Sequence, residues 1–193
     1  QAFQQLNKNQ EVRFHRIGTP QSADELVYAT PADPELGHVA QVTHDGRWAV
    51  IRTSRGTDAK YELHVIPLAG QKIEARWPRP GQEHLPPGQF AQSGGKRPAI
   101  PARWTATAVV RGLEHDWRLI EGMGDTLYFA TNKGAPRLKV VKVEVARPEL
   151  FRVDCTGELE QATGCFQSRY NFVDVVPERP ETLDRAQIVG DRL

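Results

Sequence analysis

"VAQVTHDGRWAVIRT", residues 39–53, is the stretch that decides the fold. Two apolar runs, residues 39–43 and 48–53, flank the tetrapeptide His-Asp-Gly-Arg at residues 44–47. An Asp-Gly pair between two apolar runs is a strong hairpin signal, because glycine accepts a positive φ and aspartate tolerates it. The stretch therefore predicts two antiparallel strands joined by a tight turn.

The same order of elements occurs twice along the chain: a strand, a turn containing Gly and Asp, a strand, a loop containing Gly, and a strand. The other predicted strands are residues 61–66 in the first copy and residues 117–120, 126–131 and 138–145 in the second. Residues 138–145 show the clearest period-two alternation, which is typical of a half-buried strand. A third copy is predicted to begin at Ile188.

Repeated antiparallel units of this size are typical of a β-propeller, whose blades take about 40 to 50 residues each. We therefore predict an all-β fold, a partial β-propeller of two to three blades, with residues 1–193 as a fragment of that domain. Residues 12–73 and 105–193 are predicted to be blade-like, and residues 74–104, rich in Pro and Gly, to be an insertion or loop. A β-sandwich is the main alternative, since it also contains short strands at regular spacing.

Charge and hydropathy argue against two classes of partner. The 193 residues carry 25 basic and 24 acidic side chains, and the basic ones are scattered, as in Arg47, Arg52 and Arg55. Phosphate binding needs a basic cluster, so we expect no nucleic-acid partner. No apolar stretch approaches the roughly 18 to 20 residues of a membrane span, so we expect no membrane partner. The N-terminus has neither a start methionine nor a signal peptide, and the C-terminus stops where a strand, a Gly-Asp turn and a second strand would begin, so we expect both ends to lie within a longer protein.

The two cysteines, Cys155 and Cys165, are separated by nine residues. A disulfide between them would suit a periplasmic or secreted protein, and two free thiols would suit a cytoplasmic one. Both alternatives stay open, and so does the compartment.

His15, Ser22 and Asp24 lie close together in the sequence and invite a hydrolase hypothesis. The chain has no G-x-S-x-G, the motif that places a nucleophilic serine on a sharp strand-to-helix turn. Triads also gather their members from distant parts of a chain. We therefore interpret these residues as polar loop side chains and predict no catalytic residue here.

Other candidate sites have simpler structural explanations. His38 and His44 lack a third metal ligand at suitable spacing, so a structural or surface role is favoured and no metal is expected. Residues 94–96, Gly-Gly-Lys, follow no predicted strand and lack the rest of a phosphate loop, so no cofactor is expected.

Seven further side chains fall into two groups. We interpret the aromatic ones as core between blades and the acidic ones as a solvated strand edge. The aromatic group is Trp48, Trp117, Tyr128 and Phe129, and the acidic group is Glu114, Asp116 and Glu121.

Three segments resemble the N-terminal propeller of the prolyl oligopeptidase family, serine peptidases that cleave short peptides after proline. They are "FHRIGTPQSADELVYATPADPELG" (14–37), "VTHDGRWAVIRTSRGTD" (42–58) and "EHDWRLIEGMGDTLYFATNKGAPRLKVVKVEV" (114–145), in the family's order. Within the third, "TNKGAPR" (131–137) is especially characteristic. A weaker match is "VVPERPETLDRAQIVGDRL" (175–193).

The resemblance implies a function. In this family the segment after His-Arg-x-Gly-Thr is a mobile loop on the propeller face turned toward the catalytic domain, so Thr19, Gln21, Ser22 and Asp24 would belong to a gating loop. The implied partners are an α/β-hydrolase domain, which carries the catalytic Ser, Asp and His, and proline-containing peptides. The alternative is a non-catalytic propeller-like module that binds a peptide or protein.

The sequence departs from the family pattern in two places. Tyr61-Glu62 stands where the family usually has Asn-Arg after the Gly-Thr-Asp turn. If that Arg faces substrate in the family, its charge is reversed here. The insertion at residues 74–104 also separates segments that are normally closer.

Overall fold

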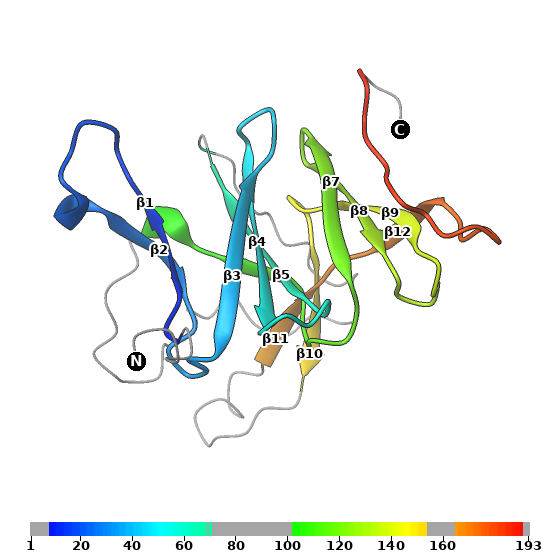
Figure 1. Cartoon of the computed structure of the whole chain (residues 1–193), viewed down its shortest axis with the longest axis horizontal. Coiled ribbons are helices and arrows are strands. Elements are labelled where there is room, and N and C mark those ends of the chain that lie inside the picture. The colour runs from blue at the N-terminus through cyan, green and yellow to red at the C-terminus, as the bar shows by residue number, and fades with distance from the viewer. Residues whose placement is uncertain (1–7, 69, 71–101, 154–164, 191–193) are drawn as a thin grey trace.

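The computed structural model describes residues 8–68, 70, 102–153 and 165–190. In this part of the chain almost every regular element is an antiparallel β-strand (Figure 1). The strands form two four-stranded sheets and two separate hairpins, which confirms the predicted all-β fold and its propeller-like repetition.

The first four-stranded sheet, the first blade, has the strand order β3-β4-β5-β6. Its strands are β3 (Leu36–Val42), β4 (Trp48–Arg55), β5 (Glu62–Pro67) and β6 (Thr107–Val110). The predicted hairpin forms: Gly46 has a φ of +70°, and its N–H donates to the Thr43 carbonyl at 2.8 Å. The strand pairing then aligns Val42 with Ala49.

The second four-stranded sheet, the second blade, has the order β12-β9-β8-β7. Its strands are β7 (Trp117–Met123), β8 (Thr126–Thr131), β9 (Lys139–Glu144) and β12 (Phe172–Val176). The three strands predicted for this copy match β7, β8 and β9 closely. The third copy predicted from Ile188 is represented, among the described residues, by an isolated bridge at Val189.

Each blade has a fourth strand that the sequence reading missed. β6 pairs with β5 across the connection at residues 68–106, and β12 pairs with β9 across residues 145–171. Both fourth strands are short, and each lies far along the chain from its partner. Most of the predicted insertion, residues 74–104, lies outside the described residues; its last three form the 3-10 helix η3 (Ala102–Trp104).

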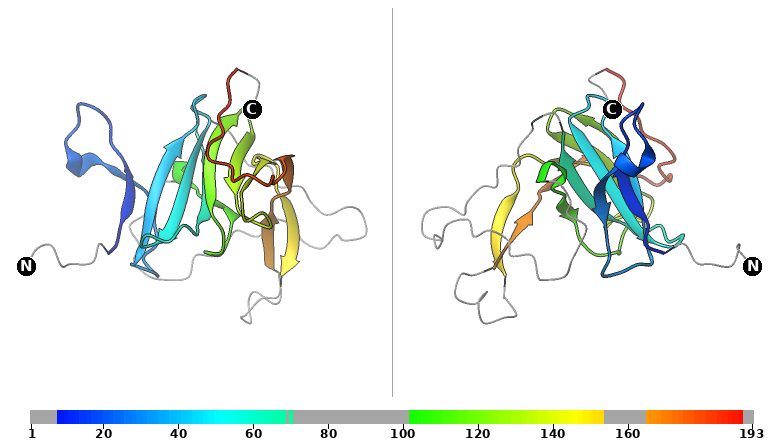
Figure 2. Two further views of the ribbon diagram at one scale, coloured as in Figure 1. Left: turned by 45° about the vertical axis from the view of Figure 1, so that its right-hand side comes forward. Right: turned by 90° about the vertical axis from the view of Figure 1, so that its left-hand side faces the viewer.

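Two hairpins complete the structure. β1 (Glu11–Phe14) pairs with β2 (Glu25–Ala29), and β10 (Glu149–Val153) pairs with β11 (Cys165–Arg169). β2 leads into β3 through residues 30–35, just as β6 leads into β7 through residues 111–116. The β1–β2 hairpin therefore occupies the place of the third and fourth strands of a preceding blade, and Figure 2 shows it beside the first blade.

The largest apolar core lies between the two blades. Trp48, Trp117 and Phe129 are almost fully buried there, as predicted for residues between blades. Tyr128, which was assigned to the same core, is half-buried and does not belong to it, because successive side chains on β8 point to opposite faces of the sheet. Leu127 and Phe129 face the core.

A smaller core lies on the opposite face of the first blade. Ala49, Ile51 and Ile66 pack there against Val27 and Tyr28 of β2. The first blade is thus covered on both faces, which explains why β4 is a continuous apolar run rather than an alternating one.

The β3–β4 turn, the β7–β8 turn and the β1–β2 loop lie at one end of the sheets, uppermost in Figure 1. We call this end the upper rim and define it as residues 15–24, 43–47 and 124–125. Within the described residues, no helix is long and apolar enough to cross a membrane.

Candidate functional site

The loop at residues 15–24 is the longest described segment of the upper rim, and we call it the rim loop. The Thr19 N–H and hydroxyl both donate to the Arg16 carbonyl, at 3.0 and 2.7 Å, around Gly18 at a φ of +90°. The 3-10 helix η2 (Gln21–Ala23) then leads back to β2. These local turns give the loop a defined form without packing its tip, since the side chain of Ile17 is 96% exposed.

The base of the rim loop is closed by one strong polar contact. His15 Nδ1 lies 2.6 Å from Asp24 Oδ1, and the Asp24 side chain is largely buried. Arg13 adds a bond to the Asp24 carbonyl at 3.4 Å. The ends of the loop are therefore held together while its middle faces solvent.

The structure brings two of the three supposed triad residues together. His15 and Asp24 form the pair just described, but Ser22 is exposed, and no hydrogen bond among the described residues joins it to His15. A histidine-carboxylate pair with no nucleophile on the other ring nitrogen cannot start acyl transfer. The pair has a structural explanation as the closure of the loop.

The four residues predicted to gate differ in their surroundings. Gln21 and Ser22 are exposed, whereas Thr19 and Asp24 are less exposed, Thr19 in its turn and Asp24 against His15. The structure thus separates two exposed residues at the surface of the loop from two residues that hold its shape. Gating itself stays a prediction for all four.

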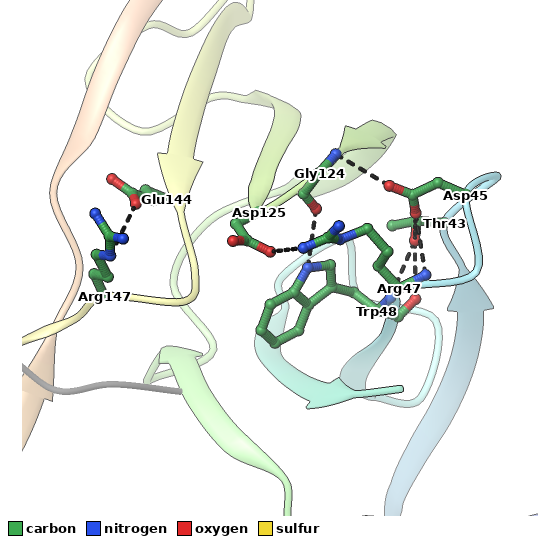
Figure 3. Close-up of polar contacts among 8 residues, drawn as sticks. All are labelled: Thr43, Asp45, Arg47, Trp48, Gly124, Asp125, Glu144 and Arg147. Carbon is green, nitrogen blue, oxygen red and sulfur yellow. Dashed lines mark hydrogen bonds and ion pairs between the residues drawn. The ribbon is translucent and has the colours of Figure 1, made fainter. Parts of the chain in front are cut away.

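The two blades are joined at the upper rim by a polar network, drawn in Figure 3. Asp45 Oδ1 accepts from the Thr43 hydroxyl at 2.6 Å and from the Arg47 N–H at 3.1 Å. Asp45 Oδ2 accepts from the Gly124 N–H of the second blade at 3.0 Å. One carboxylate therefore shapes its own turn and also ties it to the turn opposite.

Three more contacts cross between the blades here. The indole N–H of Trp48 donates to the Gly124 carbonyl at 3.0 Å, and the Arg47 guanidinium lies 2.8 Å from Asp125 Oδ1 (Figure 3). The His44 N–H donates to Glu121 Oε1 at 3.0 Å. We call this set of contacts the inter-blade lock; the Arg147–Glu144 pair in the same view, 3.8 Å apart, lies within the second blade.

The inter-blade lock also depends on the absence of a side chain at Gly122. A Cβ added at Gly122 would collide with the Thr43 methyl group and would lie 2.8 Å from Leu127 Cδ2. The blades approach each other this closely because residue 122 is glycine.

Electrostatics favour the charged form of Asp45. Partial burial on its own would raise its pKa, but the hydrogen bonds from Thr43, Arg47 and Gly124 outweigh burial and lower the pKa below the ordinary value. Asp45 is therefore ionised near pH 7.

A second polar cluster lies between β2 and the first blade. His38 is buried, with Nδ1 3.0 Å from the Thr53 hydroxyl and Nε2 3.1 Å from the Thr30 hydroxyl. This confirms a structural role for His38. The ring of Tyr28 lies edge-on to His38, with 5.0 Å between centroids, and its hydroxyl lies 3.3 Å from His64 Nδ1.

We call Tyr28, His38 and His64 the histidine seam. Burial lowers the pKa of His38, and burial together with the charge of Arg111 lowers that of His64 to about 4. Both rings are therefore neutral near pH 7. Sequence reasoning missed His64, although its position on the same face of β5 as Ile66 was a readable signal.

Three acidic residues were predicted to form a solvated edge, and one prediction was wrong. Glu114 is exposed, but Asp116 is buried and binds the Arg118 guanidinium, with Nε 2.8 Å from Asp116 Oδ2. Glu121 is half-buried because it accepts the His44 N–H of the inter-blade lock.

Tyr61 and Glu62, which depart from the family pattern, lie at the end of the blade opposite the upper rim. The Arg52 guanidinium lies 4.4 Å above the Tyr61 ring, and Glu62 Oε1 accepts from the Gly112 N–H at 3.0 Å. The Tyr61 N–H also donates to the His115 carbonyl at 2.9 Å, so both residues support the connection between the blades.

Within the described ranges, no group of three His, Cys, Asp or Glu side chains could hold a metal ion. The predicted alternatives for Cys155 and Cys165 lie outside what the structure describes, since Cys155 and the side chain of Cys165 are not among the described parts.

A sequence model of the family described as "Prolyl oligopeptidase, N-terminal beta-propeller domain" matches residues 1–193. Prolyl oligopeptidase A of Amanita bisporigera is 28% identical over 146 residues, which is 76% of this chain and 16% of that protein. A prolyl endopeptidase of Elizabethkingia miricola is 26% identical over 144 residues, 75% of this chain and 16% of that protein. The chain therefore spans a small part of the length of these relatives.

Two solved structures show the same fold. One, from a study of two prolyl endopeptidases and their inter-domain dynamics, is 33% identical with a TM-score of 0.63, over 97% of this chain and 20% of that one. The other is prolyl oligopeptidase B of Galerina marginata bound to a 35mer hydrolysis and macrocyclization substrate. It is 20% identical with a TM-score of 0.61, over 93% of this chain and 19% of that one. The chain belongs to the prolyl oligopeptidase family, in the region that forms the N-terminal β-propeller domain.

Proposed function

We propose that this chain controls the access of proline-containing peptides to an α/β-hydrolase domain in a longer protein. The observation that carries the proposal is the form of the rim loop. His15 and Asp24 fix its base at 2.6 Å, whereas Ile17 at its tip is 96% exposed. A segment with a fixed base and an unpacked tip can change position without unfolding the sheet beneath it.

The chemistry is acyl transfer by a serine nucleophile, and we assign it to the catalytic domain rather than to this chain. The rim loop offers no serine hydrogen-bonded to a base among its residues. Its contribution is to exclude peptides too large to pass, so that a large peptide reaches the nucleophile only when the loop moves.

Support for the substrate class comes from the relatives. The Elizabethkingia protein is named as a prolyl endopeptidase, and the Galerina protein was solved with a 35mer substrate bound. We therefore propose peptides that contain proline as the substrates of the longer protein, with the rim loop deciding which lengths enter.

The test compares Asp24→Asn with Asp58→Asn in the intact protein. The first weakens the His15 contact; the second changes an exposed carboxyl in the β4–β5 loop, at the end away from the upper rim. Hydrolysis of a short and a long proline-containing peptide is measured for each. Because a hydrogen bond to a charged group contributes about 1.5 kcal/mol, we expect the long-to-short rate ratio to rise by up to about tenfold in Asp24→Asn.

Asp58→Asn should keep the ratio of the unsubstituted protein. An unchanged ratio in both variants would contradict gating by the rim loop. Peptide binding without hydrolysis by the intact protein would contradict the proposal in another way and would favour a non-catalytic binding module.

A further inference from the structure

The rim loop is flanked by residues that reach the neighbouring blade. The residues that flank it, Phe14 and Glu25, contact Arg103 and Trp104 of η3, which comes directly before β6. We call these four residues the rim clasp. Phe14 and Glu25 belong to the β1–β2 hairpin, whereas Arg103 and Trp104 precede β6 of the first blade, so the clasp joins segments that are far apart in sequence.

Glu25 is the centre of the clasp. Its Oε2 accepts from the Trp104 indole N–H at 3.0 Å, and its Oε1 pairs with the Arg103 guanidinium. Hydrogen bonds from Arg103 and then Trp104 lower the pKa of Glu25. One carboxylate therefore uses both oxygens on two neighbouring residues of η3.

Aromatic contacts surround this polar centre. The rings of Phe14 and Trp104 lie 5.3 Å apart between centroids, and the Arg103 guanidinium carbon lies 4.8 Å from the Trp104 ring and 5.8 Å from the Phe14 ring. A cation over an aromatic face adds attraction to an ion pair that is otherwise screened by solvent. Trp104 also packs on the smaller core that contains Val27.

Two adjacent acids thus hold the loop in different ways. Asp24 binds His15 and closes the loop on itself, whereas Glu25 binds η3 and fixes the loop to the first blade. Breaking the first contact loosens the shape of the loop. Breaking the contact of Glu25 with η3 lets the loop change position while it keeps its shape.

We propose that Glu25 and Trp104 are positioning residues that set where the rim loop sits, by coupling it to the end of the β5–β6 connection. The inference rests on the proposed function, because the loop matters for substrates through gating. The position of the rim loop is then set from the first blade, so that a shift of residues 102–104 moves the loop.

Hydrogen exchange in the intact protein tests the clasp directly. The variants are Glu25→Gln, which removes the charge, and Trp104→Phe, which removes the indole N–H and keeps a ring against Phe14. The matched control is Glu35→Gln, which weakens exposed pairs with Lys8 and Arg55 in the connection between β2 and β3. We expect amide exchange across residues 15–24 to rise several-fold in both clasp variants and to stay unchanged in the control.

Exchange at residues 127–129, in the core of the second blade, reports general loss of structure and should stay slow throughout. Equal exchange of the rim loop in all four proteins would overturn the proposal, as would a rise that residues 127–129 share. The long-to-short hydrolysis ratio separates the two proposals. Faster exchange with an unchanged ratio would support the clasp and contradict gating.

Discussion

Two contacts of the first blade, one with the second blade and one with the β1–β2 hairpin, differ in kind. Toward the second blade it presents a large apolar core with Trp48, Trp117 and Phe129, closed at the upper rim by the inter-blade lock. Toward the β1–β2 hairpin it presents a smaller core together with the histidine seam. One contact is mainly apolar packing, and the other mixes packing with neutral polar rings.

The difference between these two contacts fits the proposed function, in which the blades form a support and the hairpin carries the rim loop. Apolar burial contributes about 25 cal/mol of stability per Å² and does not depend on pH. A buried neutral imidazole, in contrast, destabilises the fold once it is protonated, because a buried charge is costly. The joint between the blades should therefore be a rigid support. The hairpin, which carries the rim loop, should be the part that is released first.

Gly122→Ala should have the largest effect on stability, because it disrupts the packing between the two blades. The new methyl group would collide with Thr43 and Leu127, and overpacking at such a site costs about 3 kcal/mol. We expect a lower free energy of unfolding in urea. Addition of Thr43→Ser, which removes the methyl group in the way, should restore part of the loss; no restoration would show that the blades do not approach here as described.

Acid should destabilise the contact between the first blade and the β1–β2 hairpin. The folded-state pKa of His64 is lowered to about 4 from an ordinary 6.5, so the unfolded chain binds the proton more readily. Stability from the neutral ring is complete above about pH 6.5 and decreases as the pH falls toward 4. We expect a loss of about 2 kcal/mol between pH 7 and pH 5 by urea unfolding.

His64→Gln should flatten this pH dependence, while His44→Gln, at an exposed turn, should leave it as it is. Equal slopes for the unsubstituted protein and His64→Gln would contradict the assignment to the seam.

The Arg47–Asp125 pair should have the smallest effect, although its distance is only 2.8 Å. Both side chains are partly exposed, and such pairs contribute up to about 1 kcal/mol. A double-mutant cycle with Arg47→Ala and Asp125→Ala should give a coupling energy within that range that shrinks in salt. A coupling well above it would mean that the lock, rather than the apolar core, holds the blades together.

Local signals in the sequence predicted most of the sheet structure. The Asp45-Gly46 turn and the strands on both sides of it need only residues a few positions apart, and the turn forms with Gly46 at positive φ. The fourth strands were missed because β6 and β12 have no nearby partner in sequence. Their pairing depends on how the chain returns to the sheet.

The polar contacts of the site were harder to predict for the same reason. Trp48 reaches Gly124 across 76 positions, and Trp104 reaches Glu25 across 79. No periodicity or motif signals such pairs. The resemblance to the family predicted a loop after Gly18 and Thr19, because these residues belong to a local motif, but it gave no sign of the clasp.

We expect the β1–β2 hairpin to be held less firmly than the joint between the two blades. Hydrogen exchange of the intact protein near pH 7 tests it on two buried strand segments, residues 26–28 of β2 and residues 127–129 of β8. Residues 26–28 should exchange faster, through local opening of the hairpin. Equal or slower exchange of residues 26–28 would contradict this expectation, because the rim loop would then stand on the more rigid of the two contacts.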